Sequence, residues 1–259
     1  MIIKTYKDLQ DYFLAFSKGE ISLLIIRSEG GLSKSFTAKQ VLNGKNALFF
    51  KGHSTPLSIY LRVFKNPEHL ICFDDVDSLV HNKVSVALLK QLCEIDDNKL
   101  IRYDSTVKVD GKVVPSHFDS NNKVLLLCND FRRIGRNIKA LLTRGIYIDF
   151  RPSITEILKV LSGLSSLNAE IFNFLEFHAE SIKDFNIRLY FKLLELRRGG
   201  IDWKDYVRAE FSINQDKELA FEIRDFPSQQ RNERWVAETG KSVRHLQRIL
   251  KQLNDKTTC

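Results

Sequence analysis

The feature that most constrains this chain is an alternation, over its first 150 residues, of short apolar runs with longer amphipathic stretches. Each apolar run has seven residues or fewer and is rich in Ile, Leu, Val and Phe, as expected for strands buried on both faces. The runs are residues 21–27, 47–51, 69–73, 123–128 and 146–150, and helical patterns lie between them at 34–42, 56–64, 83–95 and 138–142. Strand and helix in alternation predict an α/β fold, a mostly parallel sheet flanked by helices on both faces.

Two segments depart from this alternation. Residues 100–114, with Asp110 and Gly111 at their centre, predict a hairpin inserted before the fourth core strand. After Pro152 the strand pattern stops, and three stretches carry apolar residues at helical spacing. These stretches are 153–163, 168–181 and 187–198, the last ended by Gly199 and Gly200. We therefore predict a core over 1–152, a small helical unit over 153–200 and a more polar region over 201–259.

Composition and charge narrow the class of protein. No apolar run is long enough to cross a bilayer, and the N-terminus lacks the cationic-then-apolar order of a signal peptide. The four cysteines lie far apart without a C-x-x-C pair, so neither a zinc site nor a disulfide framework is expected. These features predict a reduced cytoplasmic protein with no membrane partner. The net charge of +8 favours anionic partners, nucleic acid first, although many enzymes are this basic.

The first apolar run leads directly into residues 28–35, SEGGLSKS, and then into a helix. Backbone N–H groups and the helix dipole at such a junction attract anions. Lys34 would reach the β- and γ-phosphates of a nucleotide, and the Ser35 hydroxyl would bind Mg²⁺. The pattern G-x-x-x-x-G-K-[ST] is broken twice, by Ser28 and Ser33. These eight residues alone are equally compatible with a surface turn that carries a lysine.

Polar residues follow the third and fourth apolar runs. At the carboxyl edge of a parallel sheet, Asp74 can bind Mg²⁺ through water, and Asp75 can orient or deprotonate an attacking water. Asn129 is placed to hold that water or the γ-phosphate. Taken alone, an acidic turn and an Asn after a strand are common turn residues. Their position after Lys34, on the expected strands, favours a nucleotide site.

In order and spacing, these landmarks resemble the AAA+ ATPases over roughly residues 1–200. Residues 28–35 look like the Walker A loop, residues 73–77 (FDDVD) look like Walker B, and Asn129 matches sensor 1. The sequence departs from the family at the two loop serines and at Asp75, where the family usually has Glu. The shorter carboxylate bears on the rate of hydrolysis more than on binding.

Two arginines complete the resemblance. Arg144, just before the last core strand, stands where the family carries its arginine finger, and Arg188 matches sensor 2. Arg144 would then reach the nucleotide of a neighbouring subunit, which implies a homo-oligomer, a hexamer or a filament. Three further arginines precede Arg144 closely, so the finger is not assigned to one residue: Arg132, Arg133 and Arg136. Each of these roles competes with a solvated arginine at a helix end.

The resemblance implies ATP and Mg²⁺ as cofactors and residues 153–200 as a helical lid. The metal would be held by Ser35 and Asp74, and hydrolysis would use Asp75, Asn129, Arg144 and Arg188. The residues that would bind the nucleotide are Gly30, Gly31, Leu32, Ser33, Lys34, Ser35 and Phe36.

The C-terminal region carries an independent pattern. Residues 230–238 and 242–253 are helix-like and are joined by a short turn at Gly240, which resembles a helix-turn-helix DNA-binding module. Its expected core is Trp235, Val236, Val243, Leu246, Ile249 and Leu250. Its expected DNA contacts are Lys241, Arg244, His245, Arg248 and Lys251, with Gln247 beside them. The alternative is a basic helical hairpin that closes the lid.

These features predict an AAA+ ATPase that assembles on DNA and serves replication, loading, transposition or recombination, with a helicase or a recombinase as a further partner. The rival interpretation is an ATP-liganded DNA-binding scaffold that hydrolyses weakly or not at all. Ser28, Ser33 and Asp75 favour this rival.

Overall fold

A computed structural model describes residues 1–52, 54–75, 79, 82–104, 108–109, 112–129 and 140–257. Its central element is a six-stranded sheet in the order β1-β10-β2-β9-β4-β3, in which every pairing is parallel. The strands are β1 (Ile2–Ile3), β2 (Leu23–Arg27), β3 (Ala47–Lys51), β4 (Leu70–Asp74), β9 (Val124–Cys128) and β10 (Ile146–Phe150). The five strands predicted from apolar runs are therefore confirmed, and β1 adds an edge strand.

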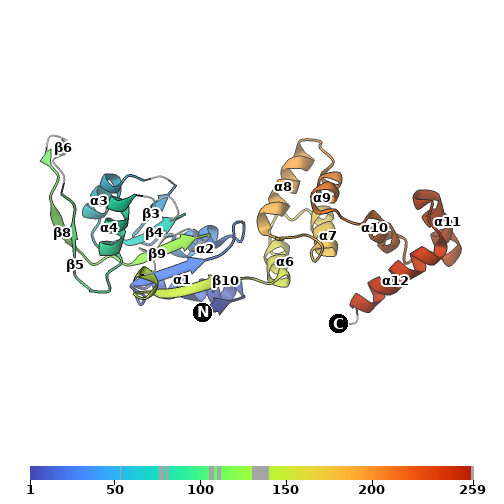
Figure 1. Ribbon diagram of the computed structural model, residues 1–259, viewed down its shortest axis with the longest axis horizontal. Coiled ribbons are helices and arrows are strands. Elements are labelled where there is room, and N and C mark those ends of the chain that lie inside the picture. Colours follow the sequence, from blue (N-terminus) through green and yellow to red (C-terminus); the bar gives the residue numbers. More distant parts are fainter. Residues whose placement is uncertain are drawn as a thin grey trace. The chain divides into compact units, whose positions relative to one another are not determined.

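Helices cover both faces of the sheet, as the alternation predicted (Figure 1). On one face α1 (Tyr6–Ser17) contacts α2 (Lys34–Leu42), and on the other α3 (Pro56–Phe64) contacts α4 (Lys83–Leu92). In β2, Leu23 and Ile25 belong to the core under α3 and α4. Leu24, on the opposite side of the same strand, is also fully buried. Burial on both faces explains why each strand is a continuous apolar run.

The predicted hairpin is present and longer than expected. β5 (Lys99–Arg102) pairs antiparallel with β8 (His117–Ser120), and β6 (Lys108–Val109) pairs with β7 (Lys112–Val113). The expected turn at 110–111 lies outside the described residues. Figure 1 shows the hairpin extending beyond α3 and α4.

A buried lysine anchors the root of this hairpin. The Lys99 ammonium donates to the carbonyl oxygens of Leu92 (2.8 Å) and Asn122 (2.7 Å), which joins β5 to the end of α4 and to the turn before β9. Burial lowers the pKa of Lys99 to about 8, because the charged form loses solvation. The two carbonyl acceptors give the buried amine the hydrogen bonds that it needs.

The chain divides into two compact units. The first is Met1–Leu167 with Asn186–Leu189, and the second is Asn168–Phe185 with Tyr190–Cys259. After the sheet the helices are α6 (Ile154–Ser162), α7 (Ala169–His178), α8 (Ile187–Arg198), α9 (Trp203–Phe211), α10 (Gln215–Glu222), α11 (Ser228–Thr239) and α12 (Val243–Thr257). The first turn of α8 thus belongs to the first unit and the remainder to the second. The boundaries at 152 and 200 stay predictions.

Helices α10, α11 and α12 pack around a small core of their own, and we call them the C-terminal module. Its fully buried centre is Trp235, and the other buried residues are Ala220, Ile223, Leu246 and Ile249. The two predicted helices are present, and Gly240 ends α11 with a φ of 67°. The assignment of Val236 to the core is wrong. It is 46% exposed, because it lies about 100° around the helix from Trp235, which takes the inward position.

The sequence patterns did not predict α9 and α10. Both helices begin with a side-chain cap, from Asp202 and Asn214. The apolar residues of α9 lie at helical spacing between Trp203 and Phe211, whereas α10 is mostly polar. Among the described residues, no helix has the length and apolar character that a membrane span requires.

Candidate functional site

The loop after β2 has the backbone geometry of an anion cradle. Gly31 and Ser33 both have left-handed φ values, 85° and 56°, and α2 begins directly after them at Lys34. Ser33, the residue that precedes the helix, makes no side-chain cap, so the first N–H groups of α2 keep their capacity for an anion. Ser28 is fully buried, and its backbone N–H donates to the carbonyl of Cys128 in β9 (3.1 Å). The start of the loop is therefore held against β9, the strand beside β2.

Lys34 is the centre of this site. It is 7% exposed, and its ammonium donates to Oδ1 of Asn129 (2.5 Å) and to the carbonyl of Ser28 (3.3 Å). Burial lowers the pKa of Lys34, while the nearby carboxylates of Asp74 and Asp75 act in the opposite direction. The structure thus brings together the loop lysine, both acidic residues and the asparagine that the sequence predicted.

Ser35 and Asp74 supply oxygen donors at the same place. The Ser35 hydroxyl donates to Oδ1 of Asp74 at 2.6 Å. A hydroxyl and a carboxylate this close fit Mg²⁺, which is bound through one or two protein oxygens together with water and phosphate. Asp75 follows with a φ of 70°, a conformation that Asp tolerates better than most residues. Its backbone N–H donates to the carbonyl of Leu127 (3.2 Å), so β9 fixes the backbone on which this carboxylate is carried.

The first turn of α8 lies against the loop. A Cβ atom added to Gly31 would lie 2.6 Å from Oδ1 of Asn186, and one on Gly30 would lie 3.7 Å from Nη1 of Arg188. Gly31 therefore has two reasons to be glycine, its positive φ and this close approach. Asn186 also accepts a hydrogen bond from the backbone N–H of Leu189 (3.2 Å), which caps the helix. The Arg188 guanidinium is thus beside the phosphate loop of its own chain.

Arg144 lies at the edge of the sheet where the strands begin, opposite the carboxyl edge that carries the loop. It is exposed, and its Nη1 donates to the carbonyl of Lys90 in α4 (3.3 Å). The next residue, Gly145, packs on Leu23 at the start of β2, whereas the phosphate loop follows the other end of that strand. Five residues at about 3.3 Å each separate the two edges by roughly 16 Å. The other candidate fingers, Arg132, Arg133 and Arg136, and the Walker B residues Val76 and Asp77 lie outside the described residues.

One supporting residue was missed in the sequence. Tyr6, in the first turn of α1, donates its hydroxyl to the carbonyl of Leu32 in the loop (3.3 Å). Burial, with Glu156 next in effect, raises the pKa of this hydroxyl, so it stays a neutral donor. The Leu32 side chain is buried and the Phe36 side chain is 62% exposed. Nothing in the local sequence indicates the Tyr6 contact, because it joins residues far apart in the chain.

The five predicted DNA contacts fall into two groups. Lys241 and His245 both lie against Oδ2 of Asp216 in α10, at 2.5 Å and 3.2 Å. The hydrogen bond from Lys241 lowers the pKa of Asp216, so these two side chains are held by an anion of their own module.

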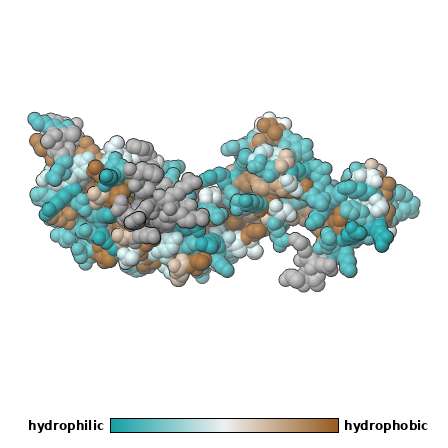
Figure 2. Space-filling model, viewed as in Figure 1, coloured by the Kyte–Doolittle hydropathy of each residue, from teal (hydrophilic) through white to brown (hydrophobic). Residues whose placement is uncertain are grey.

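The other three contacts, Arg244, Arg248 and Lys251, are exposed and lie along α12. Together with the exposed Gln247 they form what we call the α12 stripe. The spacing of i, i+3, i+4 and i+7 sets these side chains on one face of the helix. On the face seen in Figure 2, hydrophilic residues cover most of the C-terminal module.

Solved structures provide the only comparison that yields matches, since no family model and no curated protein matches the chain. A variant of RuvB from Thermotoga maritima aligns with a TM-score of 0.50 at 13% identity, over 90% of this chain and 81% of its own. A second variant of the same protein aligns with a TM-score of 0.50 at 12% identity, over 92% of this chain and 82% of its own. A structure from work on katanin self-assembly is 17% identical over 74% of this chain and 68% of its own, but its TM-score of 0.45 supports no inference.

The chain has the fold of the AAA+ P-loop ATPases. The RuvB likeness and the parallel sheet with helices on both faces agree on this fold. At such low identity the likeness extends to the fold alone.

We predict opposite effects for glycine at the two loop serines. Ser33→Gly should raise the free energy of unfolding by about 0.5–1 kcal/mol, because a residue with a Cβ is strained at φ 56°. Ser28→Gly should lower it by about 1 kcal/mol, because Ser28 is buried and its hydroxyl donates to the carbonyl of Glu29 (3.1 Å). Urea denaturation of both variants checks this, and equal destabilisation by both would contradict the strain at Ser33.

Proposed function

We propose that this chain binds ATP and Mg²⁺ at residues 28–36, hydrolyses the nucleotide, and acts on DNA as an ATP-driven homo-oligomer. The observation that carries the proposal is the pair of contacts from Lys34 to Asn129 and from Ser35 to Asp74 at one edge of a parallel sheet. The nucleotide-binding core would be residues 1–152, with a lid over 153–200 and a DNA-binding region over 201–259.

The proposed chemistry assigns one task to each group. Backbone N–H groups of residues 30–36 and the Lys34 ammonium would bind the phosphates. Ser35 and Asp74 would hold Mg²⁺, which neutralises charge on the phosphate oxygens. Asp75 would orient a water and accept its proton, and Asn129 would hold the same water in line. Arg188 would contact the γ-phosphate, since its guanidinium already lies beside Gly30.

We predict that Lys34 and Asp75 separate binding from hydrolysis. Lys34→Ala should weaken ATP binding at least about 10-fold, because it removes a charge-assisted contact to phosphate. Asp75→Asn should keep ATP affinity and lower the turnover number, because its role concerns the water and not the bound nucleotide. Calorimetric titration and phosphate release measure the two effects. Unchanged ATP affinity in Lys34→Ala would refute the assignment of residues 28–36 as the phosphate-binding loop.

Oligomerisation enters through Arg144. Because it lies at the far edge of the sheet from its own loop, Arg144 would stabilise a phosphoryl transition state only in a neighbouring subunit. Hydrolysis would then depend on assembly, and the active site would be complete only between two copies of the chain.

We predict that Arg144→Ala binds ATP normally but does not hydrolyse it. Mixing this variant with Lys34→Ala should restore part of the phosphate release, because some interfaces then combine an intact loop with an intact arginine. Assembly of mixed oligomers is checked by sedimentation with one variant labelled. No recovery in confirmed mixed oligomers, or full activity in a strict monomer, would refute the role in trans.

The DNA part of the proposal rests on the α12 stripe. Arginine and lysine neutralise phosphates, and arginine and glutamine also bond base edges. Lys241 and His245, which Asp216 holds, would contribute less to DNA than the sequence suggested. The rival, an ATP-liganded scaffold with little hydrolysis, is favoured by the short Asp75 carboxylate. Phosphate release with and without DNA distinguishes the two.

We predict that Arg244→Ala with Arg248→Ala weakens DNA binding. The slope of log affinity against log salt should flatten by about 0.9 for each DNA phosphate that an arginine no longer neutralises, and ATP affinity should not change. The matched control is Lys7→Ala with Lys65→Ala, which removes the same charge from exposed positions in the first unit. Equal loss of DNA affinity in both variants would mean that only net charge matters, and no loss in either would refute the α12 stripe.

A further inference from the structure

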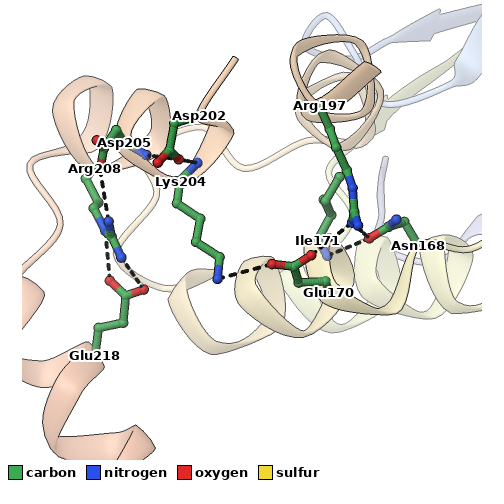
Figure 3. Close-up of polar contacts among 9 residues, drawn as sticks. All are labelled: Asn168, Glu170, Ile171, Arg197, Asp202, Lys204, Asp205, Arg208 and Glu218. Carbon is green, nitrogen blue, oxygen red and sulfur yellow. Dashed lines mark hydrogen bonds and ion pairs between the residues drawn. The ribbon is translucent and has the colours of Figure 1, made fainter. Parts of the chain in front are cut away.

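One carboxylate joins three helices of the second unit. Glu170, in the first turn of α7, pairs with Arg197 of α8 (3.0 Å) and with Lys204 of α9 (3.2 Å). Arg197 also donates to Oδ1 of Asn168, the residue that caps α7 (2.8 Å). Figure 3 shows these side chains converging between the helices. Glu170 therefore ties α8 and α9 to the same point on α7.

Aromatic packing supports this polar joint. Trp203, at the start of α9, is buried and meets Phe174 of α7 edge to face, with ring centroids 5.1 Å apart. The Tyr190 hydroxyl of α8 accepts a hydrogen bond from the backbone N–H of Asn168 (2.8 Å). Helices α7, α8 and α9 are thus fixed to one another by apolar and polar contacts together.

A second joint attaches α9 to the C-terminal module. Arg208 of α9 makes two parallel hydrogen bonds to Glu218 of α10, from Nε (3.0 Å) and from Nη2 (2.8 Å) (Figure 3). The side chains are 26% and 9% exposed, so the pair is largely removed from water. Arg208 also binds Asp205 of its own helix (2.9 Å), which orients the guanidinium. A bidentate pair of this kind fixes angle as well as distance.

The connection between α9 and α10 leaves little freedom. Only three residues separate the helices, and each of them is engaged. Ser212 ends α9 in a left-handed conformation, Ile213 is buried and donates its backbone N–H to Arg208 (3.1 Å), and Asn214 caps α10. Beside this link, Phe177 of α7 packs against Phe221 of α10, with the ring planes tilted by 37° and the centroids 4.1 Å apart. The module is therefore attached at three places, whereas a flexible linker would attach it at one.

We infer that Arg208 and Glu218 lock the C-terminal module onto α7, α9 and the part of α8 from Tyr190 onward, so that these parts of the second unit move as one rigid body. The consequence rests on the proposed function: DNA bound along the α12 stripe would be held by the whole rigid body and not by a module on a flexible tether.

The rigid body is tested without ATP or DNA, so the result does not depend on the proposed function. Spin labels at Arg198→Cys on α8 and Gln252→Cys on α12 report the distance between these exposed positions. The labelled chain carries Cys259→Ser, because Cys72, Cys93 and Cys128 are buried and do not react. We expect one narrow distance distribution in the parent chain and a broad one after Glu218→Gln. The control Glu233→Gln makes the same change at an exposed carboxylate of α11, which accepts a hydrogen bond from Gln229 of its own helix (2.9 Å), and should leave the distribution narrow.

A broad distribution in the parent chain, or an unchanged one in folded Glu218→Gln, overturns the inference. Thermal melting followed by circular dichroism establishes that each variant is folded. Arg208→Lys is the second variant, since it keeps the charge but cannot form two parallel bonds to Glu218. It should broaden the distribution as Glu218→Gln does.

Discussion

The structure depends on a lysine buried at the carboxyl edge of a parallel sheet. The direct hydrogen-bond acceptors of the Lys34 ammonium are neutral, Asn129 and the Ser28 carbonyl, and burial lowers its pKa. Desolvating an ammonium is costly unless opposite charge is near, and here the carboxylates of Asp74 and Asp75 supply only part of it. An anion bound by the N–H groups of the loop would supply the rest of the negative charge. The fold thus holds a cation in a place that suits a polyphosphate.

The parallel sheet makes this arrangement possible. Because neighbouring strands end at the same edge, residues from three distant stretches meet there: the loop after β2, the acids after β4 and the asparagine after β9. The same geometry puts Arg144 at the opposite edge, beside the start of β2. In the proposed assembly, the loop edge of one chain would meet the Arg144 edge of its neighbour.

The sequence predicted those parts that local pattern determines. The runs 47–51 and 146–150 coincide with β3 and β10, and 187–198 coincides with α8, because buried strands and a helix ended by two glycines leave clear patterns. The sequence did not predict β1, because a strand of two residues leaves no recognisable pattern. It also did not predict α10, a polar helix that tertiary contacts hold in place.

Contacts between distant residues were beyond prediction. Asn186 against Gly31, and Asp216 holding Lys241 and His245, join positions that only the fold brings together. Val236 was misplaced for a related reason. Both Trp235 and Val236 are apolar, and the three-helix packing decided which of them faces the core. The candidate roles of the site residues remain proposals that rest on this geometry.

The most direct test is a crystal structure of the chain with Mn²⁺ and a non-hydrolysable ATP analogue, with the metal located by anomalous scattering. The account predicts the triphosphate within residues 28–36, with Lys34 on its phosphates and Mn²⁺ bound to the Ser35 hydroxyl. A nucleotide bound elsewhere, or a loop that stays empty at saturating analogue while Lys34 still donates to Asn129, would contradict it.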